Sequence, residues 1–191
     1  MMDGQKQTHF FGKKQERRDR IAKMLHLTDD QKKQIKALHD EAKKKMEALK
    51  NDQNITLKEF YNRSTAIRKE MREKRAAILT KEQTNQIANI KTEREKRRKE
   101  RFEQHLIHMK YELELSENQV KEIQKVHARN AESIQKIKSE ESINDHDKKV
   151  KIKSLRAGQK EEMKKIFTAD QLKKIDEIKL KTRSKKRNNQ K

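Results

Sequence analysis

Apolar residues along this chain recur at steps of three and four positions rather than in continuous runs. One such series lies in the first half of the chain, at Ile35, Leu38, Ala42, Met46 and Leu49. A parallel series lies in the second half, at Ile123, Val126, Ile134 and Ile137, with the polar Asn130 at the position that corresponds to Ala42. This spacing is typical of an amphipathic helix with one apolar face. The pattern therefore predicts a long helix from Thr28 to about Lys50 and a matching helix in the second half.

A second stripe follows in each half. The first runs through Phe60, Ser64, Ile67, Met71 and Ile78, and its counterpart opens near Asn144 and carries Ile152, Leu155, Met163 and Ile166. The chain has no proline and three glycines, of which Gly158 falls inside the second of these stripes at a cost of about 1 kcal/mol relative to Ala. Alternating β-branched runs are absent. These features predict an all-α fold of long amphipathic helices.

Four short motifs stand at matched positions. Each has an apolar residue, Thr or Ser, two polar residues and Gln, as in Leu27, Thr28 and Gln31; Leu79, Thr80 and Gln83; Leu115, Ser116 and Gln119; and Phe167, Thr168 and Gln171. A hydroxyl residue followed three positions later by Gln is a capping box, in which each side chain binds the other residue's backbone N–H. A further box is expected at Thr56 and Glu59.

The spacing of the motifs repeats. Leu27 and Leu79 are 52 positions apart, as are Leu115 and Phe167, and the two pairs are offset by 88 positions. A period that long, present twice, indicates a tandem duplication of one helical unit. We expect the first unit at 21–98, a helical connector at 99–108 and the second unit at 109–186. Disordered tails are expected at 1–20 and 187–191, and disorder at the C-terminal end is expected to begin as early as Thr182.

Composition argues for a looser chain than periodicity does. Charged residues make up 43% of the sequence, hydrophobic residues 30%, and the formal net charge is +21. These values approach those of disordered chains, but the ordered apolar stripes outweigh them. The chain contains no cysteine, which excludes thiol catalysis and disulfides, and no apolar stretch long enough for a membrane span or a signal peptide. Its start resembles a mature domain from which a leader has been removed.

The paired Leu-Thr-x-x-Gln motifs on a small, basic, helical unit resemble the Spy/CpxP family of bacterial periplasmic proteins. The resemblance covers residues 21–98 and 109–186. Ser116 and Phe167 depart from the family motif, and the usual member carries one pair of motifs and forms a cradle-shaped homodimer. The resemblance implies an ATP-independent chaperone in the periplasm that binds unfolded or partly folded clients on a basic, partly apolar concave surface, without a cofactor. Two units in one chain suggest a thin, cradle-like pseudo-dimer, either as a monomer or within a homodimer.

Flexible Met and long cationic side chains on the second helix of each unit are the candidates for such a client surface. They are Arg63, Arg68, Met71, Arg72 and Arg75 in the first unit and Lys151, Arg156, Lys160 and Met163 in the second. Positive charge would steer acidic chains at long range. Taken singly, each is also what an ordinary solvated helix face would carry.

Two other functions compete with this one. A sequence pI near 10.0 and clusters such as Lys96–Lys99 satisfy the electrostatic criterion for nonspecific nucleic-acid binding, although specific recognition motifs are absent and aromatic residues are only 4%. His105 and His108, with Glu112 one turn on, are weak candidates for a metal site in an envelope-stress sensor of the same superfamily. We expect no enzymatic activity, because the chain has neither a phosphate loop nor a nucleophile elbow.

Overall fold

The computed structural model describes Glu16 and residues 19–188 of the chain. Helices account for nearly all of this part, and no strand occurs within it. After a helical stretch at 19–24, six long helices follow: α2 (Asp29–Asn51), α3 (Leu57–Ile78), α4 (Lys81–Leu113), α5 (Glu117–Ser139), α6 (Asp145–Ile166) and α7 (Ala169–Asn188). The predicted all-α fold is confirmed. None of the described helices combines the length and the apolarity needed to cross a bilayer.

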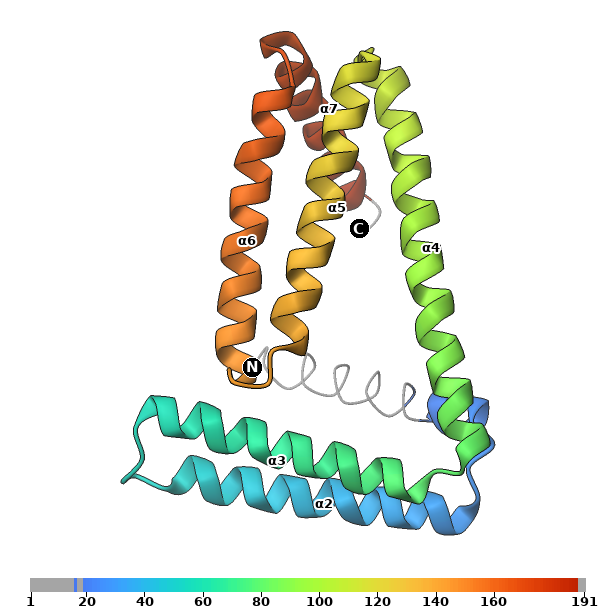
Figure 1. The fold of residues 1–191 in the computed structure, drawn as a ribbon, viewed down its shortest axis with the longest axis vertical. Coiled ribbons are helices and arrows are strands. Elements are labelled where there is room, and N and C mark those ends of the chain that lie inside the picture. The colour runs from blue at the N-terminus through green and yellow to red at the C-terminus, as the bar shows by residue number, and fades with distance from the viewer. Residues whose placement is uncertain (1–15, 17–18, 189–191) are drawn as a thin grey trace. The chain divides into compact units, whose positions relative to one another are not determined.

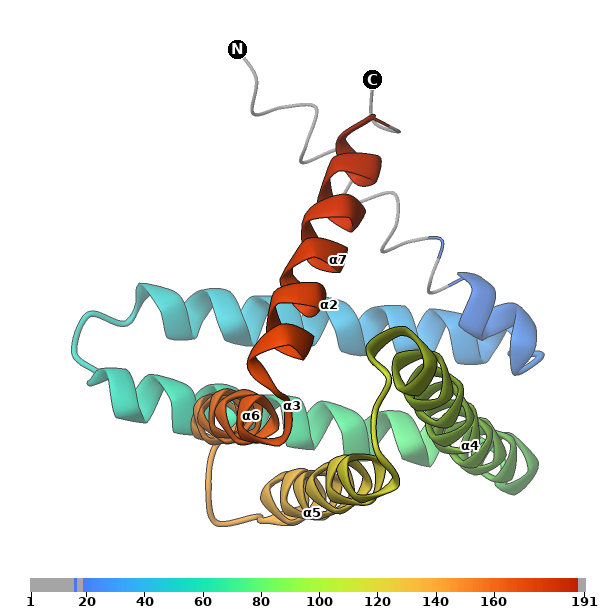
Figure 2. The same cartoon turned by 90° about the horizontal axis from the view of Figure 1, so that it is seen from above.

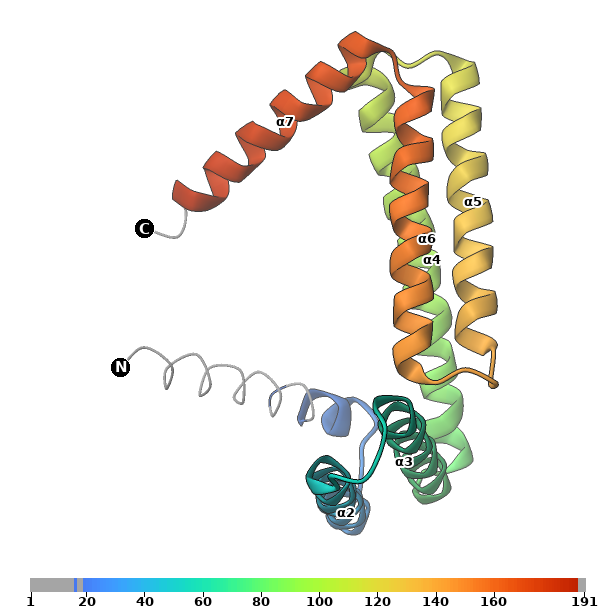
Figure 3. The ribbon, with the colours of Figure 1, turned by 90° about the vertical axis from the view of Figure 1, so that its left-hand side faces the viewer.

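The chain divides into two compact units, at residues 1–94 and 95–191. In the first unit α2 and α3 lie side by side as a helical hairpin (Figure 1). In the second unit α5 and α6 form an equivalent hairpin, which Figure 3 shows along its length and Figure 2 almost end-on. The continuous helix α4 begins in one unit and ends in the other. The single connecting helix expected from the sequence is therefore present.

The boundary between the units falls before the expected connector at 99–108, and the connector belongs to the second unit. The reason is packing, because Phe102 and Leu106 from this stretch join a core with Leu113, Leu115 and Ile123. Leu106 and Ile123 are 4% and 1% exposed, so this core excludes water almost completely. In the first unit the buried apolar side chains are Leu25, Leu49 and Met71.

The ends of the described chain are more helical than the sequence suggested. Asp19 and Arg20 already lie in a helical stretch, and α7 continues past Thr182 to Asn188. Neither segment contains proline or glycine, and their Lys and Arg residues are good helix formers. The remaining residues of the two expected tails, 1–15, 17–18 and 189–191, lie outside the described residues.

Candidate functional site

The four motifs begin helices as capping boxes. The Thr28 side chain accepts a hydrogen bond from the Gln31 backbone N–H at 3.2 Å, and the Thr28 backbone N–H donates to the Gln31 side-chain oxygen at 3.1 Å. The same reciprocal pair of bonds occurs at Thr80, Ser116 and Thr168. Thr56 and Glu59 form the fifth expected box, and the Asn144 side chain caps α6, the helix expected to open near this residue. Each cap satisfies backbone donors that a helix leaves unpaired at its start.

The Gln residues also join the two motifs of a unit to each other. Gln31 Nε2 donates to Gln83 Oε1 at 2.9 Å, and Gln83 Nε2 donates to Gln31 Oε1 at 3.1 Å. Gln31 Nε2 also reaches the Ile78 carbonyl at the end of α3, at 2.9 Å, and Gln83 Nε2 reaches the Leu25 carbonyl, at 3.1 Å. We call this arrangement the glutamine junction. It binds two helix starts and two helix ends in one network.

The second unit contains the same junction. Gln119 and Gln171 exchange side-chain hydrogen bonds at 2.8 and 3.4 Å, and they donate to the Ile166 and Leu113 carbonyls at 2.8 and 3.1 Å. Each of these groups lies 88 positions after its counterpart in the first unit. Since a buried amide without partners costs about 1–3 kcal/mol, a fully paired Gln at a helix junction specifies one packing arrangement.

The turn before each first motif is also repeated. His26 and Glu114 have φ values of 48° and 53°, in the left-handed region that residues other than Gly seldom occupy. The backbone N–H of Leu27 donates to the Ala22 carbonyl at 3.0 Å, and that of Leu115 donates to the Lys110 carbonyl at 3.0 Å. This six-residue closure is a Schellman motif, which ends the preceding helix and turns the chain toward the capped start of the next.

The candidate client residues of the first unit do not all share one environment. Arg68, Arg72 and Arg75 are exposed and stand at steps of four and three, so they form one stripe along α3. Leu57, 68% exposed, and the half-buried Tyr61 begin the same stripe. The α3 residues that contact α2, Glu70 and Lys74, lie on another side of the helix. We call the cationic residues of this stripe the α3 stripe.

Arg63 and Met71 lie elsewhere. Arg63 pairs with Asp52 at 3.5 Å beside the loop that joins α2 to α3. Met71 is only 5% exposed and is part of the core of the first unit, so it is not accessible to a partner. Met71 lies within one turn of Arg68 and Arg75 along α3, so packing in the folded unit buries it, which the choice of residue type alone did not reveal.

The second unit has an equivalent α6 stripe. Arg156 and Lys160 are exposed and occupy the positions that Arg68 and Arg72 hold in the first unit. Lys151 is also exposed and pairs with Glu140 at 3.6 Å. Met163, which corresponds to Arg75, instead packs against the core formed by Leu106, Leu113, Leu115 and Ile123. The exposed surface of α6 is therefore cationic and lacks the expected Met.

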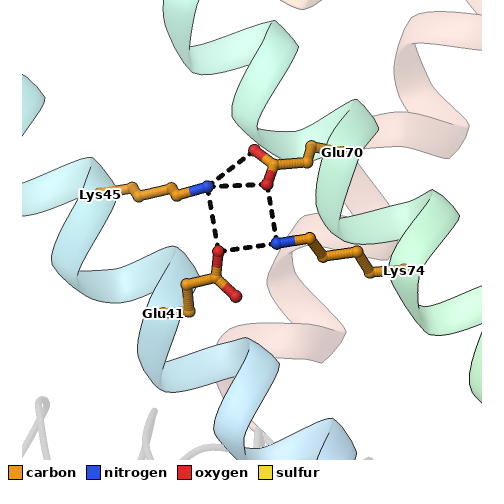
Figure 4. Close-up of polar contacts among 4 residues, drawn as sticks. All are labelled: Glu41, Lys45, Glu70 and Lys74. Atoms are coloured by element: carbon orange, nitrogen blue, oxygen red, sulfur yellow. Dashed lines mark hydrogen bonds and ion pairs between the residues drawn. The ribbon is translucent and has the colours of Figure 1, made fainter.

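A four-residue ion network crosses the first hairpin. Lys45 of α2 contacts Glu70 of α3 at 2.7 Å and Glu41 at 3.0 Å, and Lys74 contacts Glu41 and Glu70 at 2.9 Å each (Figure 4). Hydrogen bonds from the two lysines lower the pKa of both carboxyl groups. The bond from Lys74 has the larger effect on Glu41, and the bond from Lys45 has the larger effect on Glu70. The pKa values of Lys45 and Lys74 are raised, chiefly by their hydrogen bonds to Glu70.

The second hairpin replaces this network. Arg129 of α5 pairs with Glu162 of α6 at the positions of Glu41 and Lys74, with the two charges exchanged between the helices. Ser133 and Gly158 occupy the positions of Lys45 and Glu70. A hollow of about 460 Å³ opens there, lined by Arg129, Ser133, Gly158 and Glu162 among others.

The histidine candidates do not assemble a metal site. His108 Nδ1 lies 3.3 Å from Glu112 Oε2 one turn along α4, and both side chains are exposed. Among the described residues no group of three or more His, Cys, Asp and Glu side chains is arranged to hold a metal ion. His127, which the sequence did not single out, stacks on Phe102 with ring centroids 3.5 Å apart, and burial lowers its pKa.

Sequence reasoning found the caps but missed the glutamine junction. The signal was present, because two motifs at a fixed separation of 52 residues recur in both halves. Both motifs of each pair contain a Gln, and the two Gln side chains can bind each other when the chain brings the two helix starts together. Scans of protein-family models, curated proteins and solved structures found no match to this chain.

Proposed function

We propose that this protein binds unfolded or partly folded polypeptides without using a nucleotide and thereby limits their aggregation. Each unit offers a binding surface of its own, formed by the α3 stripe in the first unit and the α6 stripe in the second. The resemblance of the motifs to the Spy/CpxP family supports this proposal, as does a formal net charge of +21. Periplasmic residence and descent of the two units from an internal duplication are parts of the same proposal.

One arrangement supports this function most directly. Exposed Arg and Lys side chains recur at equivalent positions on the second helix of both hairpins, at Arg68 and Arg156 and again at Arg72 and Lys160. The exposed Leu57 adds apolar surface at the start of the α3 stripe. Long cationic side chains cover apolar surface with their stems and keep their charges in water. Such a surface can bind many polypeptides weakly and needs no shaped pocket.

Charge and apolar contact have separate tasks in this mechanism. The net positive charge attracts acidic segments over a range set by the ionic strength, about 8 Å at physiological salt. Apolar contacts with Leu57 and with the stems of Arg68, Arg72 and Arg156 then retain the captured chain. Added salt should therefore slow capture and leave part of the retention intact.

The test is light scattering of an aggregating acidic client, with and without the protein, over a range of salt concentrations and without ATP. We expect that Arg68→Glu, Arg72→Glu and Arg156→Glu together weaken protection more than reversal at Arg97, Arg98 and Lys99, which changes the net charge equally on exposed positions of α4. Circular dichroism of both variants checks that the helices persist. Equal loss in the two variants would show that only total charge matters, and no protection at severalfold molar excess would refute the function.

A further inference from the structure

The face of α4 that points away from the core of the second unit carries a row of exposed polar and aromatic side chains. Its members stand at steps of four and three residues: Arg97, Arg101, Gln104, His108 and Tyr111. We call them the outer α4 stripe. At about 100° per residue these positions share one face, roughly half a turn around the helix from Leu106 and Leu113, which are 4% and 3% exposed. The stripe is about 21 Å long at 1.5 Å per residue.

Tyr111 is the most unusual member of this row. It is 78% exposed, and its neighbour Ile107 is 57% exposed, so two large apolar side chains stand on the solvent side of the helix. With Gln104, His108 and Glu112 they line a shallow hollow of about 440 Å³ on the helix surface. An aromatic ring beside a hollow offers a flat apolar face on which another ring can stack.

The charge along the stripe is positive. Arg97 and Arg101 are exposed, and Arg101 Nε donates to the Arg97 carbonyl, which holds the Arg101 side chain along the helix. Neither guanidinium forms an ion pair within the described part of the chain. Acidic residues flank the row: Glu93 lies one turn before Arg97, Glu100 lies beside the row, and Glu112 pairs with His108 at 3.3 Å. No acidic residue interrupts the stripe itself.

We propose that the outer α4 stripe binds single-stranded nucleic acid. Arg97 and Arg101 contact successive phosphates, Gln104 and His108 offer hydrogen bonds to sugar or base edges, and Tyr111 stacks with a base. Each nucleotide joins a negatively charged phosphate to a flat base. The stripe matches this chemistry, because its arginines suit phosphates and its tyrosine suits a base. Stacking requires an unpaired base, which favours a single strand over a duplex. This inference does not depend on the proposed client-binding function.

Because the whole chain is basic, the test needs variants of equal charge. Fluorescence anisotropy of a labelled single-stranded oligothymidylate should show at least about tenfold weaker binding for Arg97→Glu with Arg101→Glu than for Lys96→Glu with Lys99→Glu. Lys96 and Lys99 are exposed residues of the same helix on a different side, so both pairs change the net charge by the same amount. The salt dependence should also weaken for the stripe variant, by about 0.7 in log–log slope for each phosphate that the variant no longer neutralises.

The aromatic interaction has its own control. Tyr111→Ala should weaken binding by about 5- to 100-fold, and Tyr111→Phe should bind like the unchanged protein because it keeps the ring. In a Tyr61→Phe background Tyr111 is the remaining one of two tyrosines, and the chain has no tryptophan, so its fluorescence should be quenched when the oligonucleotide binds. Melting temperatures of all variants should agree within error, since the stripe residues are exposed.

Three outcomes would overturn the proposal. Equal losses in the two charge-reversed pairs would mean that bulk charge alone attracts the oligonucleotide. Competition by poly-glutamate at the same concentration of charge would assign the stripe to acidic polypeptides. Equal quenching of Tyr111 by vesicles of anionic phospholipid would assign it to a membrane surface. Client protection should be the same for Arg97→Glu with Arg101→Glu as for Lys96→Glu with Lys99→Glu, so failure here is distinguishable from failure of the client-binding function.

Discussion

The two hairpins share a backbone plan and differ in what lies between their helices. In the first, Lys45 and Glu70 complete an ion network with Glu41 and Lys74. In the second, Ser133 and Gly158 stand at two of these positions and leave a hollow of about 460 Å³. The glutamine junction, by contrast, has the same hydrogen bonds in both units. The shared arrangement is therefore specified at the helix ends, and half-buried ion pairs between the helices can be exchanged at little cost.

Removing the glutamine junction is the most direct way to test this comparison, and it should have the largest effect. Gln31→Ala removes an acceptor for the Thr28 N–H and deprives the Ile78 carbonyl and the Gln83 side chain of a hydrogen-bond partner. We expect a decrease of about 2–3 kcal/mol in the free energy of unfolding, measured by urea denaturation. Gln119→Ala should act similarly in the second unit.

Gln34, which is exposed on α2, provides the control for that change, and Gln34→Ala should leave stability unchanged. Loss of the glutamine junction should also be compared with loss of the ion pairs between α2 and α3. Lys45→Ala should cost far less than Gln31→Ala, because the ion pairs of Lys45 are only half-buried and remain in contact with solvent. If Lys45→Ala proved the more damaging of the two, the helix ends would not be what specifies the hairpin.

Caps should contribute the next largest effect, and equally in both units. Thr28→Ala and Thr80→Ala each remove a bond from the motif hydroxyl to the N–H of Gln31 or Gln83. Each should lower the free energy of unfolding by about 0.5–2 kcal/mol. Ser116→Ala should do the same in the second unit. Unchanged melting midpoints for all three variants would show that the hydroxyl groups do not stabilise the helix starts.

Gly158 allows a change in the opposite direction. A Cβ atom at this position would meet nothing within 4 Å, and the residue lies inside α6. Gly158→Ala should therefore stabilise the second unit by about 1 kcal/mol, because it removes backbone freedom from the unfolded chain without a clash. Thermal denaturation followed by circular dichroism measures the gain. A decrease in stability would mean that the hollow at Gly158 must stay open for the hairpin to close.

A decrease in pH should lower the stability of the second unit more than that of the first, by a smaller amount than the changes above. Burial lowers the pKa of His127 below its usual value of 6.5, so the unfolded chain binds a proton more readily than the folded chain. The second unit should accordingly lose stability as the pH falls from about 6.5 through the lowered pKa. The carboxyl groups of Glu41 and Glu70 have pKa values below 4.5, so their contribution is lost only in more acidic solution.

Urea denaturation at about pH 7.5 and about pH 5.5 measures this difference. His127→Gln should remove the part of the pH dependence that arises in this range while leaving Phe102 in place. His146, which lies near the start of α6, is the matched control, and His146→Gln should leave the His127 contribution intact. An unchanged pH dependence in the His127 variant would mean that burial of His127 does not resist protonation.

Local features of this chain could be predicted from the sequence because their causes are local. The capping boxes join residues three positions apart, and the helices follow from apolar spacing together with the absence of proline. The helix through the charged segment at 91–101 follows instead from Glu and Lys or Arg residues three and four positions apart, which support a solvated helix. The helical end of the chain at Asn188 was missed because apolar spacing fades there while helix-forming residues continue.

The candidate surface could be predicted only in part. The sequence identified the cations of α3 and α6, and the structure leaves Arg68, Arg72 and Arg156 exposed. The sequence could not show whether Met71 and Met163 are buried, because the same apolar side chain serves equally well in a core or on a surface. Which of these applies depends on what packs against the residue.

By itself, the sequence determined the helices, their caps and the repeated spacing of the motifs, since each depends on residues within a few turns of one another. Only the tertiary structure decided that Gln31 binds Gln83 and that Gln119 binds Gln171, because residues 52 positions apart meet only after the helices return to the same junction. It also decided which side chains are exposed. Helical spacing shows which residues share a face, but only packing shows whether that face is covered.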